Sequence, residues 1–213
     1  MRSCVDYQER RTNGQFLFFC GTLSRYLFED MKSLIVTAHP SIKGFTHRIA
    51  KAYANAKGDS EIMNLYDEKW QQPFLQFEDM RHFPDNETRN RIQSKIAEAK
   101  ELVFVFPLWW GTMPAILKNF FDQNFTSGFA FRYHNGKPRG LLKGKTARIF
   151  VTCDAPKWMY GIFFFPFFIT ISLFTLRFCG VKVVSKTIFD EKRKADEKKL
   201  TEWIQKVEKM AKR

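Results

Sequence analysis

The stretch that decides the fold is ELVFVFPLWWGTMPAILKNFFDQNF, residues 101–125. It begins with an uninterrupted apolar run, 102–106, which is short, rich in Val and Phe, and followed by Pro107. Such a run is typical of a strand that is buried on both faces of a parallel sheet. After the loop 107–113, Pro114 stands at a position where a helix can begin, because the first helical residues need no N–H donor. The stretch therefore predicts a central strand that leads through a short aromatic loop into a helix.

This loop carries two adjacent tryptophans, Trp109 and Trp110. In open α/β sheets, ligands bind at the carboxyl edge of the strands, which is where this loop would lie. Two interpretations are open: both indoles fill the core, or they flank a flat ligand. Their position on a loop punctuated by Pro and Gly favours the flat ligand.

Strands and helices alternate on both sides of the central stretch. Apolar runs predict further strands at 33–38, 60–65, 146–152 and 181–189. Helical spacing predicts helices over 44–57, after a cap at Asp85, after Pro114 and after a cap at Asp190. The Gly- and Lys-rich segment 132–145 is expected to be a loop. This alternation predicts an α/β fold, a doubly wound five-stranded parallel sheet of order 2-1-3-4-5 with helices on both faces.

The first thirty residues differ from the rest, because they show no clear helical or strand period. They contain a short apolar run that resembles part of a secretory signal, but Arg25 and Glu29 interrupt the residues after it. Met31 directly precedes the first strand. We expect residues 1–30 to be a flexible N-terminal extension and residues 31–213 to form one domain.

Composition narrows the class of protein. The four cysteines form no CxxC pair and do not cluster with the histidines, which argues against a zinc site or a disulfide framework and favours a reducing, cytoplasmic location. The formal net charge is +13. Residues 132–157 carry seven Lys/Arg against one acid, and we expect this cluster to lie beside the ligand site. Residues 182–213 carry eleven against six, and we assign these charges to a solvated helix face. We expect no nucleic-acid partner and no metal.

The loop after the first strand, AHPSIKGFTHRI, leads from His39 to Gly44 and then into a helix. Exposed amides and the helix dipole favour an anion at such a helix N-terminus, and His39 and Thr46 can add side-chain hydrogen bonds to phosphate oxygens. The motif matches neither the GxGxxG nor the Walker pattern. An ordinary strand–helix turn therefore remains an alternative.

Three motifs together resemble the flavodoxin-like NAD(P)H:quinone oxidoreductase family, which includes DT-diaphorase, the modulator-of-drug-activity reductases and the ancillary reductases of bacterial potassium efflux systems. They are LIVTAHPSIKGFTHRIAKA, FVFPLWWGTMPAILKNFFDQNFTSGFAF and GKPRGLLKGKTA, and the similarity spans roughly residues 31–190. The resemblance implies a flavodoxin-like fold, a homodimer, and hydride transfer from NAD(P)H through a non-covalent FAD or FMN to a quinone-like acceptor. The flavin would carry the hydride chemistry, and the protein would supply binding and electrostatics.

The resemblance also implies the residues that hold the flavin. In the first loop, which would hold the phosphate, they are His39, Gly44, Phe45 and Thr46. Around the ring they are Pro107, Leu108, Trp109, Trp110 and Gly111, with Thr152, Cys153, Asp154 and Ala155 at the ring edge. The last group departs from the Thr-Thr-Gly-Gly loop of the family and is closer to the TMDTPxWYY form of some members. Tyr160 falls at the position of a catalytic tyrosine that assists hydride transfer, whereas Pro166 lies near the place of its histidine partner, so a tyrosine–histidine relay is not expected.

The segment 158–176, WMYGIFFFPFFITISLFTL, is nineteen residues long and carries no charge. It approaches the length of a membrane span. Three interpretations are open: a transmembrane helix, a buried wall of a dimer and its pocket, and a surface that dips into the edge of a bilayer. The dimer wall is preferred to peripheral membrane contact, because a closed dimer covers this much apolar surface without a membrane.

The leading function is a flavin-dependent NAD(P)H dehydrogenase of the quinone type. One alternative is a flavodoxin-like electron carrier, although flavodoxins are typically acidic and use a hydroxyl-rich phosphate loop. A second alternative is a flavin-binding regulatory subunit of a membrane transporter, which the apolar segment would support.

Overall fold

Five parallel strands form the central sheet of the computed structural model, which describes residues 33–76, 85–156, 158–159 and 165–213. They are β1 (Ser33–Thr37), β2 (Ser60–Asn64), β3 (Glu101–Pro107), β6 (Thr146–Thr152) and β7 (Lys182–Phe189). The order across the sheet is β2-β1-β3-β6-β7, with every neighbouring pair parallel. This confirms the predicted order 2-1-3-4-5 and the predicted central strand.

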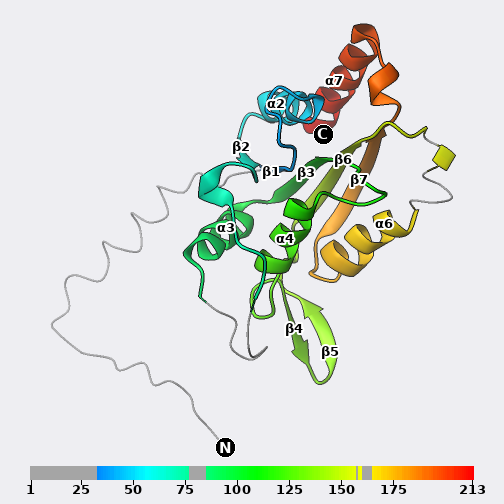
Figure 1. The fold of residues 1–213 in the computed structure, drawn as a ribbon. Coiled ribbons are helices and arrows are strands. Elements are labelled where there is room, and N and C mark those ends of the chain that lie inside the picture. Colours follow the sequence, from blue (N-terminus) through cyan, green and yellow to red (C-terminus); the bar gives the residue numbers. More distant parts are fainter. Residues whose placement is uncertain (1–32, 77–84, 157, 160–164) are drawn as a thin grey trace, which may run out of the picture. The chain divides into compact units, whose positions relative to one another are not determined.

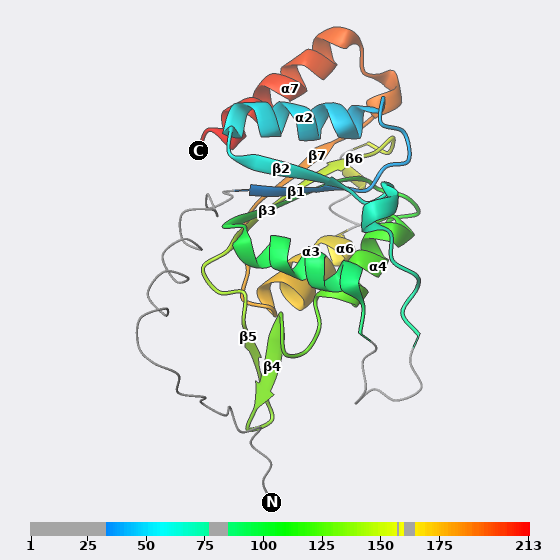
Figure 2. The ribbon, with the colours of Figure 1, turned by 90° about the vertical axis from the view of Figure 1, so that its left-hand side faces the viewer.

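Helices cover both faces of the sheet (Figure 1). On one face lie α2 (Phe45–Lys57) and α7 (Glu197–Ala211), and on the other lie α3 (Glu87–Glu98), α4 (Ala115–Asn124) and α6 (Phe165–Ile169), which continues into the π-helix η2 (Thr170–Arg177). Two short 3-10 helices are η1 (Glu68–Trp70) and η3 (Lys192–Lys194). Figure 2 shows the same three layers from the side.

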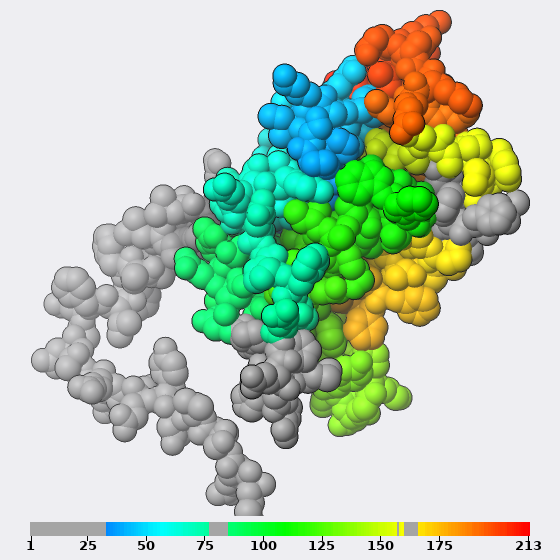
Figure 3. Space-filling view, in the orientation of Figure 1, coloured from blue at the N-terminus to red at the C-terminus, as the bar shows by residue number. Residues whose placement is uncertain are grey.

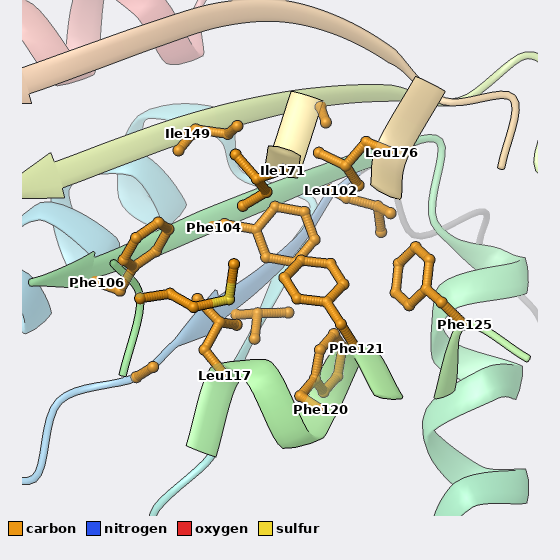
Figure 4. Packing of buried hydrophobic residues seen from close by; sticks show 14 of the residues in the cluster. Leu102, Phe104, Phe106, Leu117, Phe120, Phe121, Phe125, Ile149, Ile171 and Leu176 are labelled. Atoms are coloured by element: carbon orange, nitrogen blue, oxygen red, sulfur yellow. The ribbon is translucent and has the colours of Figure 1, made fainter. Parts of the chain in front are cut away.

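Alternate residues of β3 serve the two faces, which explains why its sequence is apolar throughout. Leu102, Phe104 and Phe106 belong to the core beneath α3, α4 and η2, whereas Val103 and Val105 belong to the core beneath α2 and α7. Figure 4 shows Phe104 packed between the rings of α4 and the aliphatic side chains of η2. The Phe104 and Phe121 ring centroids are 5.1 Å apart. Every residue of β3 is buried, as the sequence predicts for a strand covered on both sides.

Two predicted helix caps are wrong, the first by one residue and the second by six. Asn86, and not Asp85, caps α3, since its side chain accepts a 2.9 Å hydrogen bond from the Arg89 amide. The cap of α7 is Asp196, not Asp190, because η3 intervenes after β7 and Asp196 accepts from the Lys199 amide at 2.8 Å. The predicted apolar stripe of α7 does face the core: Leu200 and Val207 are buried and Trp203 packs against them.

The expected loop 132–145 is wrong in its first half. Residues Phe131–His134 (β4) and Lys137–Gly140 (β5) form an antiparallel hairpin. Asn135 and Gly136 make its turn, both with positive φ, which is the Asn-Gly hairpin signal. At the base of the hairpin, an added Cβ at Gly140 would lie 2.3 Å from the Gly180 amide nitrogen, so this close approach requires glycine.

The described part of the apolar segment is divided between core and surface. Phe167, Phe168, Ile171 and Leu176 are buried within the chain, whereas Trp158, Leu173 and Phe174 are 64%, 43% and 71% exposed. No helix among the described residues is long and apolar enough to cross a membrane. The predicted extension at residues 1–30 lies outside the described residues.

Candidate active site

A cavity of about 300 Å³ opens at the carboxyl edge of the sheet. Figures 1 and 3 look onto this edge, where segments from distant parts of the sequence lie side by side. The lining residues come from the loops after four strands: His39, Gly44, Phe45, Thr46, Pro107, Leu108, Trp109, Thr152, Cys153, Asp154, Lys192 and Arg193. The site is therefore built where the general rule for open α/β sheets places ligands.

The first loop presents an uncapped helix N-terminus to the cavity. Gly44 is the N-cap of α2 and offers no capping side chain. An added Cβ there would lie 3.0 Å from His39 Cε1 and 3.1 Å from the Ser41 carbonyl oxygen, so only glycine fits without displacing the histidine. Because the first amides of a helix have no partner within it, this arrangement suits an anion.

His39 is held in place by its own loop. Its Nδ1 accepts a 3.0 Å hydrogen bond from the Ser41 amide, and its carbonyl oxygen lies 3.2 Å from His47 Nε2. Partial burial lowers the pKa of His39. Its Nδ1 also lies 3.1 Å from the Ser41 carbonyl oxygen, so the Ser41 backbone holds this side of the ring in either tautomer.

The aromatic loop is a tight turn fixed to the sheet. Leu108 N–H donates to the Thr152 carbonyl at 2.8 Å, which continues the pairing of β3 with β6. Trp109 and Thr112 exchange two backbone hydrogen bonds of 2.9 Å, and Trp110 and Gly111 form the tip between them with positive φ. Positive φ at a tryptophan costs energy, and such residues cluster at functional sites.

The two tryptophans differ in their surroundings. Trp109 lines the cavity, lies 6.3 Å from the His39 ring between centroids and is 41% exposed. Trp110 is fully exposed at the tip of the turn and does not line the cavity. The alternative that both indoles fill the core is therefore wrong.

The loop after β6 completes the wall. The Thr152 hydroxyl lies 3.4 Å from that of Thr46, and both residues are buried. Cys153 is also buried, with its Sγ 3.7 Å from the Phe189 carbonyl oxygen. Asp154 accepts from the Arg193 amide at 3.0 Å and pairs with Arg193 Nε at 3.1 Å. These contacts tie the loop after β6 to the segment after β7.

The cavity brings together most of the predicted flavin-binding residues. Trp110, Gly111 and Ala155 lie beside it without lining it. Tyr160 lies outside the described residues.

Sequence reasoning missed Lys192 and Arg193. It assigned the charges of residues 182–213 to a helix face, whereas these two cations line the cavity from η3. The cluster expected beside the site is placed differently: Arg132, Lys137 and Arg139 lie on the hairpin and do not line this cavity. The basic triplet 192–194 is separated from the end of the last strand by two residues, and a segment that follows a parallel strand also lies at the carboxyl edge. This was the signal that the sequence offered.

The sequence of this chain is similar to those of known proteins. Residues 31–211 match the family described as having a flavodoxin-like fold. An uncharacterized NAD(P)H oxidoreductase of Haemophilus influenzae is 29% identical over 79% of this chain and 88% of its own length. A ribosyldihydronicotinamide dehydrogenase-like protein, traD, of Penicillium crustosum is 30% identical over 81% of this chain and 80% of its own.

Solved structures agree on the fold. The NAD(P)H:quinone oxidoreductase of Methanothermobacter marburgensis superposes with a TM-score of 0.74 at 24% identity, covering 85% of this chain and 96% of that one. An FMN-dependent NADH-azoreductase of Bacillus anthracis, solved in complex with FMN, gives a TM-score of 0.64 at 19% identity over 84% and 97% of the two chains. The chain belongs to the flavodoxin-like fold family, and the predicted resemblance is confirmed.

Proposed function

We propose that this protein is a flavin-dependent NAD(P)H:quinone oxidoreductase whose flavin, FMN or FAD, binds non-covalently in the carboxyl-edge cavity. The observation that carries the proposal is the convergence of an uncapped helix N-terminus, an aromatic loop and two cations in one cavity. The oxidoreductase names of the relatives that match most of the chain support the same activity.

The residues fit the two ends of a flavin. The phosphate would lie at the N-terminus of α2, where the amides after Gly44, the His39 ring and the Lys192 and Arg193 side chains surround it. The flat ring would lie against Trp109, between the Pro107–Leu108 backbone and the loop from Thr152 to Asp154. Gly111 and Ala155 would support this wall from behind, whereas Trp110 extends from the tip of the turn into solvent.

A bound flavin would accept a hydride from NAD(P)H and pass reducing equivalents to the acceptor. The chain's contribution is to orient the ring, exclude water from one side of it and place positive charge near it. We further propose a quinone-like acceptor, a homodimer, and Tyr160 as the residue that assists hydride transfer.

The deciding experiment uses the full chain purified in the presence of FMN or FAD. We expect a yellow protein whose flavin is released by heat, and whose absorbance near the flavin band is bleached by NADH or NADPH without oxygen and restored by a quinone. Bleaching by dithionite alone, with no response to either nicotinamide, would instead favour an electron carrier. A colourless protein that takes up neither flavin would contradict the proposal.

A further inference from the structure

A second cavity, of about 410 Å³, lies at the opposite edge of the sheet, where the strands begin. Lys100 precedes β3 there, and Thr146 is the first residue of β6. Figure 2 shows the C-terminus at this same edge, on the side where β1 begins. We call it the amino-edge cavity. The amino-edge cavity takes no part in the proposed flavin chemistry, since the candidate flavin site opens at the other edge of the sheet.

Cations from four separate elements converge on the amino-edge cavity. They are Lys57 from the end of α2, Lys100, Arg148 from β6 and Arg213 after α7. Among the lining residues that the structure describes, Glu101 is the single acid. A concave surface lined by one sign of charge concentrates ions of the opposite sign.

Glu101 is already satisfied by the protein. Its Oε2 accepts 2.8 Å hydrogen bonds from the hydroxyls of Ser33 and Tyr53 and lies 3.3 Å from Lys57 Nζ. Its Oε1 accepts from Arg148 Nε at 2.8 Å. The single negative charge of this carboxylate does not neutralise all the cations around it. Both of its oxygens already accept hydrogen bonds, so few positions remain for further donors.

Arg148 provides the directional feature. Its side chain is only 13% exposed, and its Nε donates a 2.8 Å hydrogen bond to Glu101. This bond and the surrounding protein fix the orientation of the guanidinium at the wall of the cavity. The planar donors of a fixed guanidinium match the paired oxygens of a phosphate group.

We propose that the amino-edge cavity binds a small phosphate-bearing anion, held by the Arg148 guanidinium and the surrounding lysines. The volume suits a compound of about nucleotide size rather than a polymer. No aromatic side chain is among the described residues that line it, so the phosphate groups rather than a base are recognised. The excess of cations over the single lining carboxylate favours a diphosphate over a monoanionic carboxylate.

The test measures pyrophosphate binding to the full chain by isothermal titration calorimetry at fixed ionic strength, with the protein saturated with flavin so that the other cavity is filled. Lys100 and Arg213 are exposed, so the double variant K100Q/R213Q should fold normally. We expect its pyrophosphate affinity to fall at least tenfold. The matched control K137Q/R139Q removes the same charge from the hairpin and should bind like the parent. The variant R148K keeps a cation beside Glu101 but loses the guanidinium, and should also bind at least tenfold more weakly.

Three results would overturn the proposal. One is the absence of pyrophosphate and ADP binding to the parent chain at millimolar concentration. Another is an equal loss of affinity in K137Q/R139Q, which would show diffuse charge attraction. The third is co-sedimentation with vesicles containing phosphatidic acid that K100Q/R213Q abolishes and pyrophosphate does not compete for, which would assign the cations to a lipid surface.

Discussion

The amide of Leu108 donates a 2.8 Å hydrogen bond to the carbonyl oxygen of Thr152. This bond joins the aromatic loop after β3 to the loop after β6, so two walls of the candidate flavin site share one backbone framework. A ligand that enters the cavity meets Trp109 in a position that the sheet itself fixes, whereas Trp110 extends beyond the turn.

The first prediction rests on this difference between the two tryptophans. Trp109→Ala removes a ring that lines the cavity and should raise the Kd of FMN about 3- to 10-fold, since aromatic contacts contribute about 0.5–1.5 kcal/mol beyond area burial. Trp110→Ala is the matched control, because the same change at a fully exposed ring should leave Kd within about twofold. Titration of the flavin-free protein by flavin fluorescence measures both values. Equal effects, or none, would remove Trp109 from the site.

The second prediction concerns the cations that the sequence did not single out. Lys192→Gln/Arg193→Gln should weaken FMN binding by about tenfold or more, because charge-assisted hydrogen bonds to a phosphate contribute about 1.5–3 kcal/mol. Riboflavin lacks the phosphate, so its affinity should not change. Lys206→Gln/Lys209→Gln removes the same charge from exposed positions of α7 and serves as control. A parallel loss of riboflavin and FMN affinity would indicate damage to the ring site instead.

The parts of the fold that could be predicted are those in which a local sequence pattern determines whether a residue is buried or exposed. The uninterrupted apolar run of β3, the stripe of α7 and the glycine before α2 all depend on short-range patterns, and each is found as expected. The Asn135–Gly136 hairpin signal was also present in the sequence, but basic side chains around it suggested a loop. Only the sheet order brings Lys192 into one cavity with the loops after β1 and β3, and the sequence could not reveal that arrangement from local pattern.

The third prediction is a pH dependence of stability centred on Glu101. Burial raises the pKa of this carboxyl, but hydrogen bonds from Arg148, Tyr53 and Ser33 and the charge of Lys57 outweigh it, so the pKa is lowered on folding. A lowered pKa contributes stability above the unfolded value, near 4.5, and that contribution is lost as the pH falls through the folded value. Denaturant unfolding measured from pH 7 down to pH 3 should therefore show that the free energy of unfolding decreases as the pH falls.

Substitution separates this contribution from general acid unfolding. Glu101→Gln should destabilise the protein by about 3–5 kcal/mol at pH 7, because it leaves Arg148 without its buried partner, and should flatten the acid limb. Glu68→Gln, at an exposed position, should leave both the stability and its pH profile unchanged. The pKa of Tyr53 is raised by burial and by its bond to Glu101, so stability should also fall as the pH rises above about 10, and Tyr53→Phe should remove that fall. An unaltered acid limb in Glu101→Gln would contradict the assignment.

The fourth prediction concerns the N-terminal residues. A shortened chain that begins at Met31 should keep the melting temperature and the NAD(P)H oxidation rate of the full chain, because residues 1–30 carry as many Arg as acids and lack a clear period, and the family match begins at residue 31. Thermal unfolding and steady-state rates, measured side by side, check this. A drop of several degrees would show that the first residues pack onto the domain.

The last prediction concerns the apolar segment 158–176. The burial of its described side chains separates the residues that pack in the core from those that a partner could cover. Phe168 is core, so replacing it would test stability rather than association. Its exposed apolar side chains include Trp158 at 64%, Leu173 at 43% and Phe174 at 71%. Phe174 lines a cavity of about 340 Å³ together with Leu75 and Phe178. An exposed apolar surface of this kind marks either a partner chain or a bilayer. We expect a second copy of the chain to cover it, because a closed dimer needs no membrane.

Leu173→Ser/Phe174→Ser should then give a monomer in sedimentation velocity with unchanged thermal unfolding of the single chain, whereas Val184→Ser, on the exposed side of β7, should remain a dimer. Retention of the dimer together with loss of vesicle binding would assign the surface to a membrane instead.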